Sequence, residues 1–448
     1  MKHSLKAAVL ISLLLAAPAT AAPTVQEFTL PEAGAQPQDL VLGPDGNIWF
    51  AERGLSKIGR ISATNPGTID EFPTKDAGAS PDIMTVGPDG NIWFTEQSNN
   101  SIGRITPSNP LAPDSFGGFG LLDPRGIAVG PDGNLWVTDA GTTPPLVVIV
   151  SPAGAKLGDV ELPAGFNARN IAKGPDNNMW VAGFSSQKIA RITTAGTPTL
   201  DPPEGYDVGG VTPLDIIAGN DGNLWYTAQG TTVGRMTTAG VATNFTSQGV
   251  DPFGITVGPD GAVWFAEFQA DAVGRVDAMG NTTHVTGMTA GAGPRYVTGG
   301  PGDTLWFTED TGNRVGRISG IELPQPPPPP PPPPPTDVTA PDVTRLRMTR
   351  TVFRLGGLGT VIRWTQSEDG TVIIRFERRV RGRFRRVRRT MTFQSTAGAQ
   401  RLRFRGRFDL RHPLRAGRYR MTLRVRDAAG NVSSPDRVRF RLLPRQRR

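Results

Sequence analysis

Short apolar runs alternate with turn residues along residues 24–322 in a pattern that predicts β-hairpins. In its first occurrence, the apolar run 39–42 is followed by Gly-Pro-Asp-Gly and then by the β-branched and aromatic run 47–51. Asp-Gly between two apolar runs favours a tight hairpin turn, because hairpin turns need residues that tolerate positive φ angles. Two more strands are predicted at 57–61, which contains Ile-Gly-Arg-Ile, and at 68–72. Each such unit therefore predicts one sheet of four strands.

The unit recurs at a nearly constant interval, because its tryptophans are separated by 44, 43, 44, 45, 39 and 42 residues. A repeat of roughly 40–50 residues is typical of β-propellers, in which each repeat forms one blade. Since every tryptophan occupies the same mid-strand position, we expect blade-to-blade packing rather than a sugar-stacking role. The tryptophans are Trp49, Trp93, Trp136, Trp180, Trp225, Trp264 and Trp306.

The last copy of the unit leaves little room for an outer strand before a run of prolines, whereas residues 24–30 have the outer-strand pattern. We expect this N-terminal run to complete the last blade, because ring closure removes exposed sheet edges. The predicted fold class is all-β: a seven-bladed β-propeller, a polyproline linker and a small β-sandwich.

The rest of the chain predicts three further segments. Residues 1–22 have a charged start, an apolar run and a small-residue cleavage site, which predicts a signal peptide and an exported protein. The propeller is expected at 23–323, and a linker at 324–336 contains ten consecutive prolines. Residues 337–448 alternate apolar residues with arginine, which predicts a β-sandwich. No later run is long enough to span a membrane, and the chain has no cysteine for disulfides or thiol chemistry.

The net charge of +8 hides a strong division between the two parts of the chain. Residues 336–448 contain 30 arginines and no lysine against 8 acidic residues, so the rest of the chain is acidic. The densest cluster is a candidate contact for a polyanion such as an anionic cell-envelope polymer. The alternative is a solvated strand face in an arginine-rich protein. The cluster comprises Arg378, Arg379, Arg381, Arg383, Arg385, Arg386, Arg388 and Arg389.

Residues at the start of each innermost strand are expected to surround one mouth of the propeller channel, where a small molecule could bind. Arginine and aromatic side chains at these positions suit a ligand with an anionic group, and a solvated rim without a ligand is the alternative. The candidate ligand-binding residues are Arg125, Arg169, Phe253, Arg295 and Tyr296.

An acidic residue follows the Trp-Phe-x sequence in five copies of the unit. Carboxylates at equivalent heights around the ring are candidate Mg²⁺ or Ca²⁺ ligands, and the alternative is a structural role beside backbone N–H groups or arginine. No other cofactor is indicated. The five are Glu52, Glu96, Asp139, Glu267 and Glu309.

The Gly-Pro-Asp-Gly-Asn-Ile/Leu-Trp-Phe-x-Glu and Ile-Gly-Arg-Ile units resemble those of the streptogramin lyase (virginiamycin B lyase) family over residues 24–322. The resemblance implies a seven-bladed propeller whose lyases open a cyclic depsipeptide with Mg²⁺ and a histidine base. At the corresponding positions this chain has Phe253 for a histidine, Gly293 for a metal-binding glutamate and Arg295 for the base, whereas Glu309 and Asp310 are retained. Arginine stays protonated and cannot serve as that base.

The sequence thus favours a secreted or cell-envelope-associated, non-catalytic binding protein that is monomeric and does not read nucleic-acid sequence. The alternatives are a carbon-oxygen lyase or hydrolase with an altered metal site, in which Glu309 and Asp310 are the candidate catalytic residues, and a purely structural extracellular protein. The run from Tyr419 to Asn431 also resembles the last strands of bacterial immunoglobulin-like or fibronectin-type modules.

Overall fold

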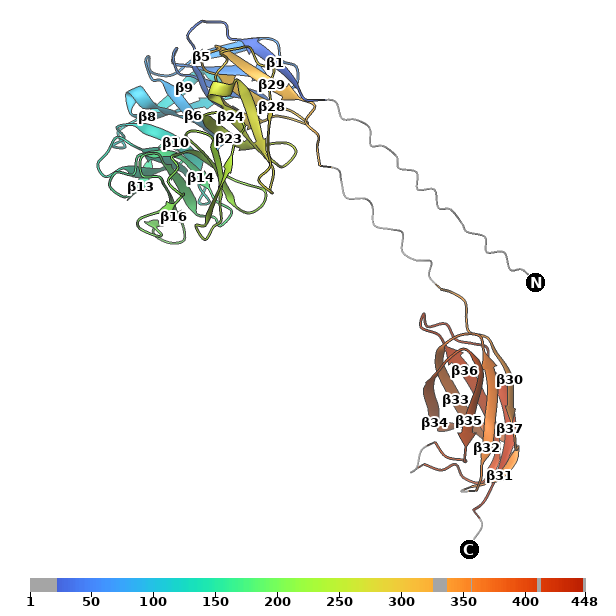
Figure 1. Ribbon diagram of the computed structural model, residues 1–448. Helices are drawn as coiled ribbons and strands as arrows, with labels where there is room; N and C mark the ends of the chain where they lie inside the picture. The colour runs from blue at the N-terminus through green and yellow to red at the C-terminus, as the bar shows by residue number, and fades with distance from the viewer. Residues whose placement is uncertain (1–21, 325–336, 356, 409–411, 446–448) are drawn as a thin grey trace, which may run out of the picture. The chain divides into compact units, whose positions relative to one another are not determined.

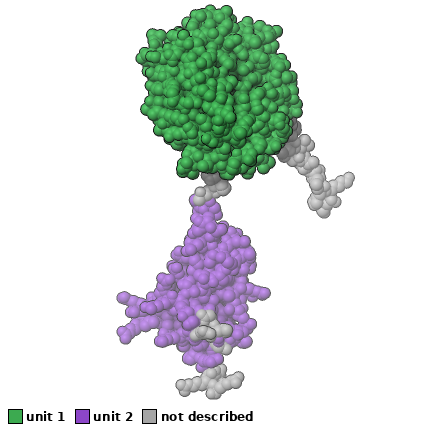
Figure 2. Space-filling view, turned by 90° about the vertical axis from the view of Figure 1, so that its left-hand side faces the viewer, with its two compact units in different colours: residues 1–326 green, residues 327–448 purple. Residues whose placement is uncertain are grey.

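The computed structural model describes residues 22–324, 337–355, 357–408 and 412–445. Apart from their margins, the predicted signal peptide and polyproline linker lie outside these ranges. The chain divides into two compact units, residues 1–326 and 327–448 (Figure 2). None of the helices within the described ranges is long and apolar enough to cross a membrane.

Within residues 22–324 the structure contains seven sheets that follow one another along the chain. The first sheet contains β2 (Pro37–Leu42), β3 (Asn47–Glu52), β4 (Lys57–Ser62) and β5 (Ile69–Pro73), and the second contains β6 (Pro81–Val86), β7 (Ile92–Glu96), β8 (Ser101–Thr106) and β9 (Asn109–Phe116). The third sheet contains β10 (Pro124–Val129), β11 (Leu135–Asp139), β12 (Leu146–Val150) and β13 (Lys156–Glu161). The fourth contains β14 (Ala168–Lys173), β15 (Met179–Gly183), β16 (Lys188–Thr193) and β17 (Thr199–Leu200), with β18 (Tyr206–Asp207) also paired to β16.

The remaining three sheets include the first strand of the chain. The fifth sheet contains β19 (Pro213–Ala218), β20 (Leu224–Ala228), β21 (Thr232–Met236) and β22 (Ala242–Thr246). The sixth contains β23 (Pro252–Val257), β24 (Val263–Glu267), β25 (Ala272–Val276) and β26 (Thr282–Val285). The last contains β27 (Pro294–Gly299), β28 (Leu305–Glu309), β29 (Arg314–Ser319) and β1 (Thr24–Thr29). The short 3-10 helices η1 (Gln97–Asn99) and η2 (Phe268–Ala270) follow β7 and β24.

The seven innermost strands form a closed circle of contacts that runs from β2 through β6, β10, β14, β19, β23 and β27 back to β2. Figure 1 shows β6, β10, β14 and β23 near the middle of this unit and β5, β9 and β13 at its rim. β1 pairs antiparallel with β29, so the expected completion of the last sheet by the N-terminal strand is confirmed. This arrangement is a β-propeller, as the repeat predicts.

The repeated residues pack in a similar way in most of the sheets, as the second sheet illustrates. Trp93 is fully buried, stacks on Phe116 with ring centroids 5.1 Å apart, and lies under the guanidinium of Arg104. Its Nε1 donates a hydrogen bond to Asp89 Oδ1 at 3.1 Å. A Cβ on Gly87 would lie 2.5 Å from the Trp93 ring, so only glycine fits beside it. The buried tryptophans therefore join strands within a blade and pack against the next one.

The second unit consists of two sheets that share one apolar core, which includes Trp364, Phe376 and Leu423. Tyr419 Oη donates a hydrogen bond to the Arg415 carbonyl at 2.6 Å, as in the tyrosine corner of immunoglobulin-type sandwiches. The immunoglobulin-like assignment stays a prediction, which this contact favours. The sheets are β30 (Val343–Met348), β32 (Thr360–Gln366) and β35 (Gly398–Phe404), and β31 (Val352–Arg354), β37 (Asp436–Leu443), β36 (Gly417–Arg426), β33 (Gly370–Val380) and β34 (Arg383–Ser395).

Candidate ligand site in the propeller channel

A β-bulge at the start of each innermost strand directs side chains into the channel. In β10, Pro124 pairs with Asp139 and Ile127 with Val137, so one extra residue is accommodated between the two pairs. Corresponding register shifts occur at the start of the six other innermost strands. Bulges re-aim side chains and are frequent beside functional sites. Here they allow the first two residues after the strand start both to reach the channel.

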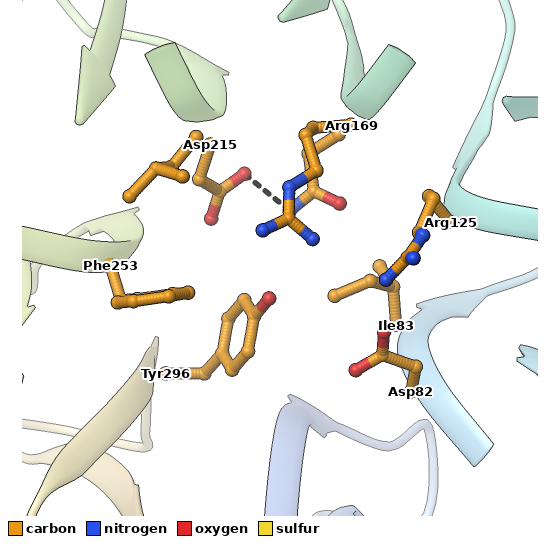
Figure 3. Close-up of a pocket in the computed structure, with 9 residues that line it drawn as sticks. Asp82, Ile83, Arg125, Arg169, Asp215, Phe253 and Tyr296 are labelled. Atoms are coloured by element: carbon orange, nitrogen blue, oxygen red, sulfur yellow. Dashed lines mark hydrogen bonds between the residues drawn. The ribbon is translucent and has the colours of Figure 1, made fainter. Parts of the chain in front are cut away.

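The channel contains a cavity with about 290 Å³ of space between its lining atoms, part of it open to solvent. Figure 3 shows Arg169 and Tyr296 projecting toward its middle and Phe253 closing one side. The part of this space that the centre of a water-sized sphere can occupy is only about 10 Å³, roughly the room needed by one water molecule. The lining side chains therefore nearly fill the cavity, and a bound group would have to be small or displace them. The lining residues are Asp82, Ile83, Arg125, Arg169, Asn170, Leu214, Asp215, Phe253 and Tyr296.

Threonines of the neighbouring blades hold the backbone of the cavity residues in place. Thr95 Oγ1 donates a hydrogen bond to the Arg125 carbonyl at 2.9 Å, and Thr138 Oγ1 donates one to the Arg169 carbonyl at 2.5 Å. Both threonines are fully buried. The cavity residues are therefore fixed by contacts between blades.

Asp215 is a buried carboxyl of the cavity that the strand-start residues alone do not reveal. It accepts hydrogen bonds from Asn170 Nδ2 at 2.7 Å and from the backbone N–H groups of Ile216 and Ile255 at 2.8 and 3.1 Å. Burial raises the pKa of Asp215 to about 6 despite these donors. Asp39 is held in the same way by the N–H groups of its own blade and the next. Because its hydrogen bonds come from its own blade and from both neighbouring blades, Asp215 is primarily a structural carboxyl.

Asp82 and Arg125 lie on the same side of the cavity (Figure 3), but each has its own partner. Gln97 Nε2 donates a hydrogen bond to Asp82 Oδ2 at 2.6 Å, and Arg125 Nη2 lies 2.8 Å from Asp123 Oδ2 in an ion pair. Burial raises the pKa of Asp82, and the charges of Arg53 and Arg125 oppose that shift. The mouth is therefore less basic than the sequence suggests, because carboxyls accompany its arginines.

Arg169 differs from Arg125 because no acidic side chain within residues 22–324 forms an ion pair with it. Its guanidinium carbon lies 4.9 Å from the ring centroid of Phe184, and its side chain forms no ion pair or hydrogen bond within residues 22–324. Burial disfavours the charged form of both groups: it lowers the pKa of Arg169 and raises the pKa of Tyr296 well above its usual range. The cavity thus offers a guanidinium beside a neutral phenol and the face of Phe253.

Arg295 differs from the other predicted ligand-binding residues because it is not among those lining the cavity. Its guanidinium carbon lies 3.9 Å from the ring centroid of Phe253 and 5.5 Å from that of Phe268. Its Nη1 is 3.7 Å from Asp310 Oδ2. Arg295 therefore supports Phe253 from behind, and four of the five predicted residues, Arg125, Arg169, Phe253 and Tyr296, meet in the cavity.

The five candidate metal ligands are fully buried, but each carboxyl ends the second strand of its own sheet and has its own neighbours. Glu96 accepts hydrogen bonds from Ser101 Oγ and Ser115 Oγ at 2.7 and 2.8 Å. Asp139 accepts them from two backbone N–H groups, and Gly249 N–H donates to Glu267 at 2.7 Å. Burial raises the pKa of Glu52 to about 8. The hydrogen bonds favour the structural interpretation for Glu96, Asp139 and Glu267, whereas neither carboxyl oxygen of Glu52 accepts a hydrogen bond from a described residue.

Glu309 and Asp310, the candidate catalytic acids, lie outside the cavity lining. Glu309 Oε2 is 3.6 Å from Arg314 Nη1, and neither of its carboxyl oxygens accepts a hydrogen bond from a described residue. Burial raises the pKa of Glu309 to about 8, and the neighbouring Glu27 adds to the shift. Neither acid therefore lies among the residues that line the cavity around Arg169.

The histidines of the described residues are His284 and His412, and neither lines the channel cavity. His284 lies on β26, the outermost strand of its sheet, with Nδ1 3.1 Å from Glu267 Oε2. His412 belongs to the second unit. No imidazole is therefore placed beside Arg169.

In the described part of the chain, three acids that could jointly hold a metal ion occur in the second unit, at Asp337, Glu368 and Asp427. Their ligand oxygens lie within 4.8 Å of one another. Asn431 already donates hydrogen bonds to Asp427 and to the Asp337 carbonyl, and the cluster by itself does not identify a metal site.

The predicted polyanion cluster falls on the β33–β34 hairpin of the second unit. Arg381 and Gly382 form its two-residue turn with φ of 50° and 83°, as a type I′ turn requires. Arg378 is half-buried and donates a hydrogen bond to the Ala416 carbonyl at 2.7 Å. The other seven arginines of the cluster are exposed. The hairpin therefore presents most of its positive charge to solvent.

A closed circle of four-stranded sheets with a cavity among its innermost strands defines a β-propeller with a candidate ligand site. The model of the Virginiamycin B lyase family matches residues 18–197 and 163–322, which together span more than half of the chain. The chain belongs to this family. No curated protein matched it.

Solved structures of lyases resemble the propeller. Selenomethionine-substituted virginiamycin B lyase from Staphylococcus aureus is 27% identical with a TM-score of 0.60, over 66% of this chain and 99% of that chain. A streptogramin B lyase is 26% identical with a TM-score of 0.60, over 66% and 97% of the two chains. A catalytically inactive His-to-Ala variant of the S. aureus lyase with quinupristin is 27% identical with a TM-score of 0.59, over 66% and 99%.

Proposed function

We propose that this protein is an exported, non-catalytic member of its family that binds a small molecule with an anionic group in the propeller channel. The observation that carries the proposal is the cavity itself, where Arg169 meets Phe253 and Tyr296 and no histidine is present among the lining residues. A carboxylate or phosphate would pair with the guanidinium in a forked geometry, and an apolar part of the ligand would rest on the aromatic rings.

The loss of lyase chemistry is inferred from the residue that stands in place of the family's histidine base. The S. aureus relative is described as catalytically inactive when one histidine is replaced by alanine. By the family resemblance, Arg295 stands at the position of the base in this chain. It stacks on Phe253, and a guanidinium group offers no acceptor for a proton. A proton-abstracting step would need another base, and neither Glu309 nor Asp310 lines the cavity.

Quinupristin is expected to remain intact when incubated with the purified protein and Mg²⁺. Liquid chromatography is the suitable measurement, because ring opening by elimination gives a linear isomer of unchanged mass. The S. aureus virginiamycin B lyase serves as the positive control. Appearance of the linear isomer with this protein would contradict the loss of activity and would favour the lyase alternative.

Benzoate, a small aromatic carboxylate, is expected to raise the melting temperature of the propeller, and Arg169→Gln should abolish that rise. A ligand that binds only the native state stabilises it in proportion to RT ln(1 + [L]/Kd). Arg235→Gln is the matched control, since Arg235 lies over Trp225, away from the cavity. An equal rise in wild type and Arg169→Gln would show that benzoate binds elsewhere.

We further propose that the second unit holds the protein at an anionic cell envelope through the β33–β34 hairpin. The support is the exposure of seven arginines around one turn, in a unit with no lysine and few acids. Export by the N-terminal segment and association with the cell surface belong to this proposal. Contacts of this kind weaken as salt rises.

A further inference from the structure

The three-stranded sheet of the second unit carries a row of arginines across its outer face. Arg347 of β30 pairs in register with Arg363 of β32, which pairs in turn with Arg401 of β35. All three are exposed. Neighbouring strands lie roughly 4.7–4.9 Å apart, and like charges directly opposite each other destabilise a sheet. The row therefore concentrates positive charge at a cost in folding stability.

A fourth arginine joins the row through an irregularity in β30. The register shifts between Thr344 and Arg347, and Arg345 within the shifted segment has a φ of 58°. A non-glycine residue with positive φ is uncommon and costs backbone energy. The four arginines line one shallow groove with Trp364, Thr365, Ala399 and Gln400, so the bulge adds Arg345 to the three arginines that pair across the strands.

The arginines of this groove lack acidic partners. Among residues 337–355, 357–408 and 412–445, the side chains of Arg345, Arg347, Arg363 and Arg401 form no ion pair or hydrogen bond. On the other sheet, by contrast, Arg420 donates two hydrogen bonds to Glu377, at 2.5 and 2.9 Å. The groove holds no aspartate or glutamate, so an external anion would relieve its repulsion.

We propose that this groove, here called the arginine row (Arg345, Arg347, Arg363 and Arg401), binds a linear phosphate polymer. Guanidinium groups bind phosphate through two parallel hydrogen bonds, and a row of cations in register matches a chain of regularly repeated anions better than a single small anion. The proposal goes beyond the hairpin contact, because the row lies on the other sheet and uses different residues.

Binding of fluorescent polyphosphate to the full chain, measured over a range of salt concentrations, tests the proposal. The double variant Arg363→Gln/Arg401→Gln is expected to bind at least about 10-fold more weakly at low salt, with the salt slope reduced by about 2, since each lost phosphate contact lowers it by about 1. A charge-matched control is Arg424→Gln/Arg426→Gln, which alters exposed arginines of β36. A second comparison, Arg383→Gln/Arg385→Gln, alters the hairpin.

Thermal unfolding separates a lost contact from a lost fold. The arginine-row variant should unfold at the same temperature as wild type or higher, because repulsion across the strands is relieved, and polyphosphate should stabilise it less. Binding unchanged in this variant, or reduced no more than in the β36 control, overturns the proposal. A loss confined to the hairpin variant also overturns it while leaving the proposed anchoring intact. Equal affinity for polyglutamate overturns the assignment of phosphate.

Discussion

Replacing Trp93 by alanine is expected to lower the free energy of unfolding of the propeller by about 3–5 kcal/mol, the usual cost of deleting a fully buried tryptophan. The ring packs with Ile127 and Val137 of the next sheet, so its removal opens a cavity between two blades. The loss should be followed by calorimetry on the propeller transition, because a chain with two units need not unfold in one step.

Trp93→Phe is the matched control, since it keeps an aromatic ring but loses the hydrogen bond from Nε1 to Asp89. It should cost less than alanine. Trp306 provides a natural comparison, because its Nε1 is buried without a partner, so Trp306→Phe should cost less than Trp93→Phe. A loss below about 1 kcal/mol for Trp93→Ala would contradict the packing role assigned to the repeated tryptophan.

Glu309→Gln is expected to stabilise the propeller above neutral pH and to flatten the dependence of its stability on pH. The pKa of Glu309 is about 8 in the folded protein, against an ordinary value of 4.5. A group whose pKa rises on folding contributes stability that is complete below pH 4.5 and is lost as pH rises toward 8. With 1.36 kcal/mol for each unit of pKa, and allowance for relaxation around Arg314, the gain near pH 9 is roughly 2–4 kcal/mol.

Melting temperatures measured between pH 4 and pH 9 check this prediction. Part of the pH dependence should persist in the variant, because burial also raises the pKa of Glu52 to about 8. Glu204→Gln, which alters an exposed carboxyl, is the control and should leave the profile unchanged. A parallel profile for Glu309→Gln and wild type would show that the Glu309 carboxyl is ionised when folded.

The propeller could be predicted from the sequence because its signals are local. Strand residues, Asp-Gly turns and the tryptophan interval lie within one repeat of about 40–50 residues, and the outer-strand pattern of residues 24–30 identified the segment that pairs with β29. The alternation of apolar residues with arginine likewise predicted the sandwich. These patterns reflect the periodicity of buried side chains along a strand, which can be read within a short stretch of sequence.

The content of the candidate site was predicted only in part. Strand-start position indicated Arg125 and Arg169 but not Asp215, because strict alternation assigns one residue of each adjacent pair to a face. The bulges bring the second residue into the channel as well, and the sequence signal was the Pro-x-Asp pattern at Pro213 and Pro37. Burial and hydrogen bonding by two blades then decide the pKa and role of that carboxyl.

By itself, the sequence determined which segments are strands, which residues turn, which tryptophans are buried and which family histidines are missing, because these follow from local pattern and residue identity. Only the tertiary structure decided which charges remain without a partner. Arg169 of the fourth sheet meets Phe253 and Tyr296 of the last two sheets in the cavity, without an acidic partner among residues 22–324, and Arg347, Arg363 and Arg401 align across three strands. The physical reason is that electrostatic pairing depends on distances between residues far apart in the chain, which strand register and ring closure set.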